Sequence, residues 1–378
     1  MTNRSPLAKL RIVTGWKGSL AVCLTLCSLE PGLSWGADSA PGAFTTFDVP
    51  DAGTAPREGT SPTTINPAGV IAGSYFDASF VAHGFVRSTD GTITTFDVPD
   101  AAVTFVAWMN PSGAITGSYA DANGASHGFV RAADGTITTF DVPGAGAASR
   151  QGTNGQGINP AGAITGFYVD GSGVSHGFLR TPDGTVITFD APDAGTSPSQ
   201  GTFPTSINPA GVIAGLYTDA SSVGHGLLRD VDGTLTAFDV PGVGTASGQG
   251  TFIGGINPAG AITGRYRDAD GVLHGYLRER DGTFTTFDAP GAGTASGQGT
   301  FAQSIQPAGA ITGRYRDANG AAHGFFRGRD GTFITFDAPG AGTASGQGTF
   351  ASSINPAGAI TGNYVDAAGV SHGYLLSH

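Results

Sequence analysis

Histidine and aspartate recur at a fixed distance along the 378-residue chain, and they are the first residues to consider for chemistry. The segment HGFFRGRDGTFITFD runs from His323 to Asp337. A His-Gly and a Phe-Asp stand fourteen residues apart in this way, His to Asp, at six places. A histidine beside a carboxylate is the core of general-base and nucleophilic catalysis, so an active site is one interpretation. A structural contact repeated along the chain is the other.

Turn chemistry predicts that the two residues face each other. If the GRDG segment forms a type I turn with a glycine bulge, the three-residue loop of residues 329–331 joins two antiparallel strands. His323 then lies opposite Asp337. The same register predicts the pairs His83 with Asp97, His274 with Asp288 and, across the two ends of the chain, His372 with Asp48. Because catalysis needs one site rather than a site in every repeat, we interpret these pairs as structural.

The chain is a series of repeats with a period of 49 residues, and one period of 44 in which the connector between Asp97 and Asn110 is shorter. Phe-Asp-x-Pro, an Asn-Pro-Ala-Gly-like turn and His-Gly each occur seven times. Glycine accounts for 63 of the 378 residues, a larger fraction than the usual ~7%. This glycine content favours a turn-rich β protein. Each repeat is predicted to hold four short strands. In the sixth repeat these are residues 299–305, 310–316, 321–327 and 332–337.

Four antiparallel strands in a period of this length are typical of a propeller blade. We therefore predict an all-β fold in which residues 43–378 form a single seven-bladed β-propeller domain of four-stranded antiparallel blades. The segment AFTTFD near the N-terminus has no His-Gly before it, and the final SHGYLLSH has no Phe-Asp after it. Pairing residues 43–48 with 370–376 would complete the last blade, close the ring and remove two exposed strand edges.

The first 36 residues differ in composition from the repeats. Four basic residues precede the apolar run GSLAVCLTLCSL: Arg4, Lys9, Arg11 and Lys17. This pattern predicts a secretory signal peptide over residues 1–36, a short segment over 37–42, and a secreted or periplasmic protein. The apolar run is too short for a permanent anchor, so no membrane insertion is expected.

Cleavage there would remove both cysteines, four positive charges and one negative charge, which changes the formal net charge from −11 to −14. The acidic balance argues against nucleic acid as a partner. Without cysteine there is no thiol nucleophile or cysteine-based metal site. The turns at 170–173, 268–271 and 317–320 match only half of a calcium loop, and we predict ordinary Asx turns. We expect no metal and no cofactor. We expect the protein to be a monomer.

Arginine breaks the sevenfold pattern in the fifth and sixth repeats. Arg265, Arg267, Arg314 and Arg316 flank the strand tyrosines, where the other repeats have Ser, Phe, Ala, Val, Leu, Thr or Asn. Such a cluster suits the carboxylate, sulfate or phosphate groups of an anionic small molecule, a polysaccharide or a protein. The alternative is local ion pairing with nearby Asp and Glu residues. That alternative is favoured because exposed ion pairs are common.

The repeated segments INPAGAITG and HGFFR, about ten residues apart in a repeat, resemble the repeats of the exported HAF-repeat family. The resemblance covers residues 44–378. Glycine stands here where the family has alanine after the histidine, and Phe-Asp-x-Pro replaces an Asp-Leu-Gly-like element. The resemblance implies an extracellular repeat protein and implies nothing about its chemistry.

Two classes of function remain open. One is an exported, non-enzymatic binding or scaffold propeller, of which a multivalent repeat lectin is a variant. The other is a propeller enzyme, a lyase or glycosidase that acts on an extracellular polymer. Glycoside hydrolysis requires a carboxylate pair, and the sequence shows none that is unique to one or two repeats.

Overall fold

Each repeat folds into short strands because turn residues interrupt every apolar run. The computed structural model describes residues 42–377, which contain 28 strands and no helix. In the sixth repeat Gly309, Gly320 and Gly331 have φ angles of 95°, 82° and 90°, a left-handed conformation that glycine adopts at little cost. They close the three predicted turns. The four strands begin and end within one residue of the predicted bounds.

The described residues all belong to one compact unit of the chain. The predicted signal peptide, residues 1–36, lies outside them, as does the 37–42 segment apart from its last residue. No helix among residues 42–377 is long and apolar enough to cross a membrane.

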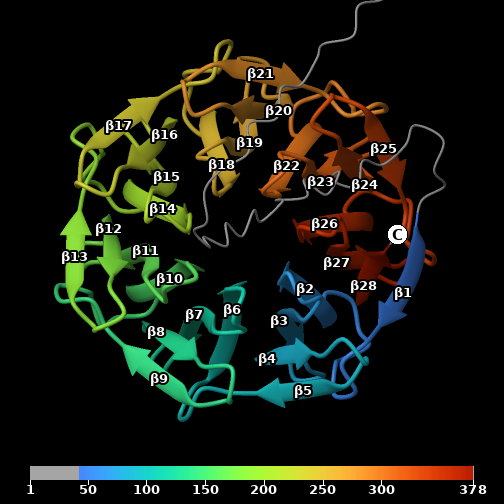
Figure 1. Ribbon diagram of the computed structural model, residues 1–378, viewed down its shortest axis with the longest axis horizontal. Helices are drawn as coiled ribbons and strands as arrows, with labels where there is room; N and C mark the ends of the chain where they lie inside the picture. The colour runs from blue at the N-terminus through green and yellow to red at the C-terminus, as the bar shows by residue number, and fades with distance from the viewer. Residues whose placement is uncertain (1–41, 378) are drawn as a thin grey trace, which may run out of the picture. The chain divides into compact units, whose positions relative to one another are not determined.

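The strands occupy four positions between the centre of a ring and its outside (Figure 1). The innermost strands are Gly59–Ile65 (β2), Val103–Met109 (β6), Gly152–Ile158 (β10), Gly201–Ile207 (β14), Gly250–Ile256 (β18), Gly299–Ile305 (β22) and Gly348–Ile354 (β26). The second strands are Ile71–Phe76 (β3), Ile115–Ala120 (β7), Ile164–Val169 (β11), Ile213–Thr218 (β15), Ile262–Arg267 (β19), Ile311–Arg316 (β23) and Ile360–Val365 (β27). The third strands are Ala82–Arg87 (β4), Ser126–Arg131 (β8), Ser175–Arg180 (β12), Gly224–Arg229 (β16), Leu273–Arg278 (β20), Ala322–Arg327 (β24) and Ser371–Ser377 (β28). The outermost strands are Ile93–Phe96 (β5), Ile137–Phe140 (β9), Val186–Phe189 (β13), Leu235–Phe238 (β17), Phe284–Phe287 (β21), Phe333–Phe336 (β25) and Ala43–Phe47 (β1).

Strands that follow one another in sequence pair antiparallel, from the innermost to the outermost, and form four-stranded sets. Most neighbouring sets are also joined by one parallel pair, such as Ser126 of β8 with Gly152 of β10. A Cβ atom on Gly152 would lie 2.0 Å from the carbonyl oxygen of Ser126, so only glycine allows this approach. Between β4 and β6 the described residues show no such pair, and Val103 stands in the place of the glycine.

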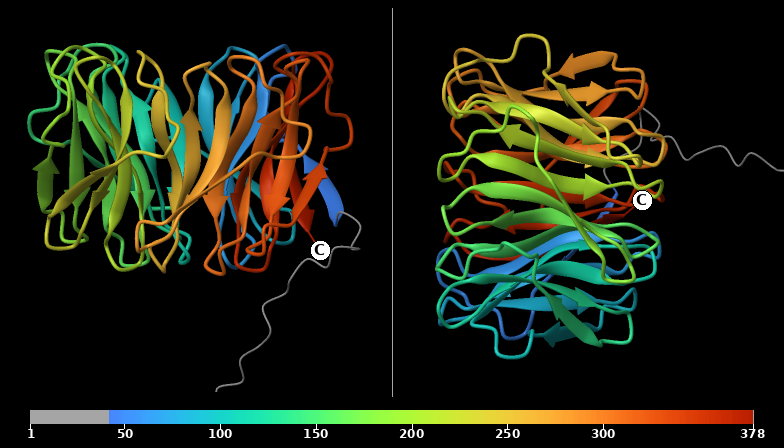
Figure 2. Two further views of the ribbon diagram at one scale, coloured as in Figure 1. Left: turned by 90° about the horizontal axis from the view of Figure 1, so that it is seen from above. Right: turned by 90° about the vertical axis from the view of Figure 1, so that its left-hand side faces the viewer.

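The apolar core lies between neighbouring sets. One cluster combines Leu277 and Ala289 of one set with Ile305, Ile311 and Phe325 of the next. Turns and connectors gather at two opposite faces of the ring (Figure 2). We call the face that carries the long connectors and the turns between second and third strands the connector face, and the opposite one the turn face.

The glycine of each His-Gly lies under the phenylalanine of a Phe-Asp. A Cβ atom on Gly324 would lie 2.2 Å from the Phe336 ring, and one on Gly275 would lie 2.3 Å from the Phe287 ring. The ring therefore occupies the space of the missing side chain. This packing explains why the two motifs keep their spacing.

The two ends of the chain meet in one set, as the sequence predicts. β1 pairs antiparallel with β28, from Ala43 opposite Ser377 to Phe47 opposite Gly373 (Figure 1). The Phe44 ring packs 5.6 Å from the ring of Tyr374. The ring of sets is thus closed by hydrogen bonds between strands, which is the arrangement of a β-propeller.

A chain that begins at Asp51 should be less stable and should self-associate. It lacks β1, so it loses the half-buried rings of Phe44 and Phe47 and exposes the edge of β28. We expect the free energy of unfolding to fall by about 2–4 kcal/mol, since a buried aromatic side chain contributes about 1.5–3 kcal/mol. Urea unfolding and light scattering measure the two effects. A chain that begins at Gly42 is the matched control, and an equally stable monomer beginning at residue 51 would refute the closure.

Candidate functional site

The predicted histidine–aspartate pairs meet across the third and outermost strands. His323 Nδ1 lies 3.0 Å from the carboxylate of Asp337. The same contact, at 2.9–3.1 Å, joins His83 with Asp97, His127 with Asp141, His176 with Asp190, His225 with Asp239, His274 with Asp288 and His372 with Asp48. The pair formed by the two chain ends has the geometry of the internal pairs.

A second carboxylate, which the sequence analysis missed, lies on the other side of each histidine. His274 Nε2 is 3.2 Å from Asp268, and the other histidines approach their second aspartate at 3.4–3.9 Å. A tyrosine ring also stacks on each imidazole, as Tyr266 does on His274 with 5.0 Å between ring centroids. The signal was available, since a Tyr-x-Asp precedes every His-Gly with its Asp six residues before the histidine.

The second aspartate also shapes the turn that carries it. The Oδ1 atom of Asp268 accepts hydrogen bonds from the backbone N–H groups of Asp270 and Val272, at 3.0 and 2.8 Å. Asp170 and Asp317 bind the backbone of their own turns in the same way. The predicted Asx turns are therefore confirmed, and among residues 42–377 no group of three or more His, Cys, Asp or Glu side chains could hold a metal ion.

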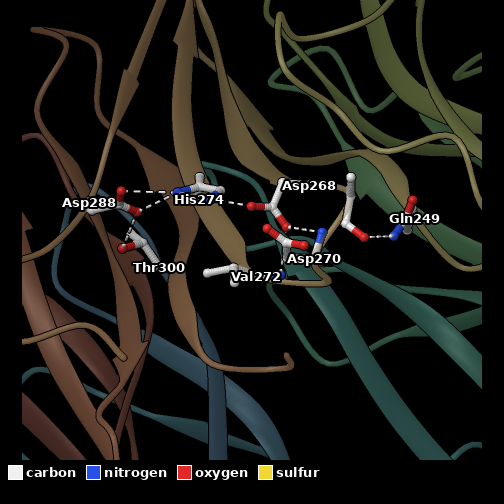
Figure 3. Close-up of polar contacts among 8 residues, drawn as sticks. Gln249, Asp268, Asp270, Val272, His274, Asp288 and Thr300 are labelled. Atoms are coloured by element: carbon white, nitrogen blue, oxygen red, sulfur yellow. Dashed lines mark hydrogen bonds and ion pairs between the residues drawn. The ribbon is translucent and has the colours of Figure 1, made fainter. Parts of the chain in front are cut away.

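Figure 3 shows one Asp–His–Asp group and the hydrogen bonds that join it to other segments of the connector face. His274 lies between Asp268 and Asp288. Thr300, from the next set, donates to Asp288 at 3.3 Å, and Gln249, from the preceding connector, donates to the carbonyl oxygen of Ala269 at 3.0 Å. The group therefore links a turn, two connectors and a neighbouring set. Because its equivalents recur in every set with both ring nitrogens facing carboxylates, we keep the structural interpretation.

Electrostatics favours the charged form of His274, His176 and Asp268. Burial lowers the pKa of His274, but its hydrogen bonds to Asp288 and Asp268 and their charges outweigh burial and raise the pKa overall. The pKa of His176 is raised for the same reasons by Asp190 and Asp170. Burial raises the pKa of Asp268, but the N–H of Val272 and the hydrogen bond with His274 lower it overall.

The four arginines singled out by the sequence come together between neighbouring sets, and we call Arg265, Arg267, Arg314 and Arg316 the arginine row. Guanidinium groups and phenylalanine rings alternate along it. Each distance here runs from a guanidinium carbon to a ring centroid: Arg265 to Phe252 5.1 Å and to Phe301 5.6 Å, Arg314 to Phe301 4.7 Å and to Phe350 5.1 Å, Arg316 to Phe301 5.2 Å. Arg267 and Arg316 donate to the carbonyl oxygens of Gly248 and Gly297 in the connectors.

The favoured prediction of local ion pairs is wrong. Within residues 42–377, every ion pair within 4.0 Å joins a histidine to an aspartate. The physical reason is that three side chains of the row lie against phenylalanine rings of their own or the next set instead of the acidic turns. The fourth, Arg267, binds a connector carbonyl oxygen. Burial and the charges of Arg265 and Arg316 lower the pKa of Arg314 to about 10. Burial, Arg267 and Arg316 likewise lower the pKa of Arg265.

Two cavities of about 280 Å³ lie elsewhere. One opens on the turn face and is lined by Asn208, Asp230, Arg278 and Arg280 among others. The other lies among the innermost strands, beside Trp108 and Gln303. The arginine row lines neither of them, so it forms a separate candidate site.

No protein-family model matches the chain, and no curated protein matches its sequence. Among solved structures, a prolyl endopeptidase is 10% identical to this chain, with a TM-score of 0.54. The match covers 84% of this chain and 49% of the endopeptidase. TolB from Acinetobacter baumannii is 15% identical, with a TM-score of 0.48 over 71% of this chain and 63% of that one. A lectin from Aleuria aurantia, a six-bladed β-propeller, is 12% identical, with a TM-score of 0.43 over 72% of this chain and 92% of that one.

These likenesses concern the fold alone. The chain spans 49% of the endopeptidase and 63% of TolB, less than two thirds of either. At TM-scores below 0.5, TolB and the lectin support no argument about this chain. Activity must therefore be argued from the residues of this chain.

Raising the pH should destabilise the protein through His176 and His274. A histidine with a raised pKa in the fold contributes stability that is complete below its unfolded pKa of about 6.5. That stability is lost as the pH rises through the folded pKa. We expect the melting temperature to fall between pH 5.5 and 8.5, and His176→Gln with His274→Gln should reduce the fall.

The matched control is Gln249→Ala, which removes a neutral hydrogen-bond donor beside the His274 group. It should leave the pH dependence of the melting temperature unchanged. Equal pH dependence in the wild type and the double variant would show that the groups of His176 and His274 do not favour the protonated imidazole.

Proposed function

We propose that this chain is an exported binding protein, a closed seven-bladed β-propeller that holds an anionic ligand at the arginine row. The blade number is supported by the seven copies of each sequence landmark and by the pairing of β26–β28 with β1 as one further set. Export is supported by the basic and apolar composition of residues 1–36. Extracytoplasmic location remains part of the proposal.

The observation that carries the proposal is a group of guanidinium charges without a carboxylate partner. Burial and the positive charges of neighbouring arginines lower the pKa of Arg265 and of Arg314, so like charges face one another. Partly buried charges are costly unless they are paired. Phenylalanine faces compensate only in part, since a cation over a ring contributes about 0.5–2 kcal/mol. An anion from solution would supply the missing partner.

The chemistry of the row indicates the ligand class. Guanidinium groups bind carboxylate, sulfate and phosphate oxygens through paired N–H donors. Arg267 and Arg316 contact the connectors at Gly248 and Gly297, so the row reaches toward the connector face. We therefore propose an anionic group, on a small molecule or on a polysaccharide, that approaches from that face.

Replacing Arg265 and Arg314 with methionine tests the proposal. Methionine keeps apolar contact with Phe301 and removes the charge, so the melting temperature in chloride should stay the same or rise. In the wild type, sulfate at about ten times its dissociation constant should add about 1.4 kcal/mol of stability over chloride at equal ionic strength. We expect a melting temperature about 2–4 °C higher, and the double variant should lose this gain.

Arg329→Met is the matched control, because Arg329 is exposed and lies in the turn between β24 and β25 on the turn face. It should keep the sulfate gain. General effects of sulfate on folding are the same in all three proteins. An identical sulfate gain in the wild type and the double variant would refute anion binding at the row.

A further inference from the structure

The junction between the sets β2–β5 and β6–β9 carries three phenylalanine rings at the connector face, and we call Phe76, Phe80 and Phe105 the aromatic patch. Phe76 ends β3, Phe80 lies in the turn before β4, and Phe105 belongs to β6. The Phe76 ring stacks on Phe80 with 4.8 Å between centroids and meets Phe105 edge-on at 6.2 Å. Phe80 is 48% exposed and Phe105 is 41% exposed.

Five of the other six sets place glycine where Phe80 stands, the exception being Ser222, and a connector covers each of these glycines. A Cβ atom on Gly271 would lie 2.5 Å from Ser296, and one on Gly320 would lie 2.7 Å from Ser345. Ser296 belongs to the TASGQ segment, residues 294–298, which has no counterpart in the connector after Asp97. The shortened connector thus uncovers this junction and leaves room for a ring.

The backbone at Phe80 is held in an unfavourable conformation. Its φ angle is 61°, in the left-handed region where bulky residues are rare, whereas the equivalent glycines adopt φ angles near 80° without strain. Strain of this kind persists only where the surrounding structure holds the conformation, and it clusters at active sites and ligand-binding sites. The parallel pair that joins most neighbouring sets is also missing between β4 and β6 in the described chain. The Phe80 ring stays half exposed although it stacks on Phe76.

The patch is too small to hold a protein. An aromatic side chain presents about 150–250 Å², so the exposed parts of the two rings amount to roughly 200 Å². A stable protein interface buries about 800 Å² on each partner. One flat cyclic unit of a polymer needs a far smaller binding surface, because the other units of the same polymer can bind elsewhere on the protein.

One charged group beside the rings narrows the ligand class. The guanidinium of Arg57 lies 5.6 Å from the centre of the Phe80 ring and has no carboxylate within 4.0 Å among residues 42–377. The faces of aromatic rings carry partial negative charge and attract C–H groups, which line the faces of sugar rings. Arg57 would hold a carboxylate on such a sugar.

We propose that the aromatic patch and Arg57 form a stacking subsite for a hexuronate unit of an acidic polysaccharide. The sugar ring lies on the exposed rings of Phe80 and Phe105, and its carboxylate faces Arg57. This inference does not rest on the arginine row, which lies in the sets of β18–β25. The two sites can fail separately.

Phe80→Gly is the variant that tests the subsite, because it restores the residue of most other sets and relieves the strained φ angle. It should fold at least as well as the wild type. Hexasaccharides of galacturonate and of mannuronate are the probes, with cellohexaose as the uncharged match, and titration calorimetry measures binding. We expect the wild type to bind at least one uronate hexasaccharide more tightly than cellohexaose, and Phe80→Gly to weaken binding at least tenfold.

Two further variants separate the contributions. Arg57→Gln should weaken uronate binding and leave cellohexaose binding unchanged, whereas Arg329→Met should leave both unchanged because Arg329 is exposed on the turn face, outside the aromatic patch and the arginine row. Equal uronate affinity in the wild type and Phe80→Gly would overturn the proposal, as would no binding of either uronate by the wild type. Wild-type dimers that Phe80→Gly abolishes would also overturn it, since the patch would then bind a second copy of the chain.

Discussion

The structure depends on one cross-strand contact, in which the His-Gly of a third strand meets the Phe-Asp of the outermost strand. The glycine leaves room for the phenylalanine ring, and the histidine binds the aspartate at 2.9–3.1 Å. Both interactions require the same register, so a slip of one residue would break them together. The aspartate also begins the connector, and each contact therefore sets where the chain enters the next set. The ends of the chain use the same contact, Asp48 with His372, to close the ring.

Because the sets are nearly identical, the places where they differ are the candidates for a specific function. The arginine row combines residues of neighbouring sets and leaves charges without carboxylates. The aromatic patch arises where one connector is shorter and a phenylalanine replaces a glycine. In both places side chains are held in arrangements that the fold itself does not require. Such arrangements are expected where a ligand supplies the compensation.

The sequence predicted what is determined within one repeat. Strand bounds and the pairing of His323 with Asp337 followed from turn length and the alternation of side chains. The second aspartate was missed although its spacing is constant, because the shape of a turn decides whether Asp268 reaches His274. The surroundings of the arginines were predicted wrongly because Phe301, which Arg265 faces, belongs to the next set. The contact between Phe76 and Phe105 likewise has no periodic signal.

The closure of the ring by the two chain ends can be tested by a disulfide between Ala43→Cys and Ser377→Cys, which are register partners. In a chain that begins at residue 37 these are the only cysteines. We predict rapid oxidation to a cross-linked monomer, seen by mass spectrometry and non-reducing electrophoresis. Thr45→Cys with Ser377→Cys, two residues out of register, should cross-link much more slowly. Cross-linked dimers, or equal rates for the two pairs, would contradict the closure.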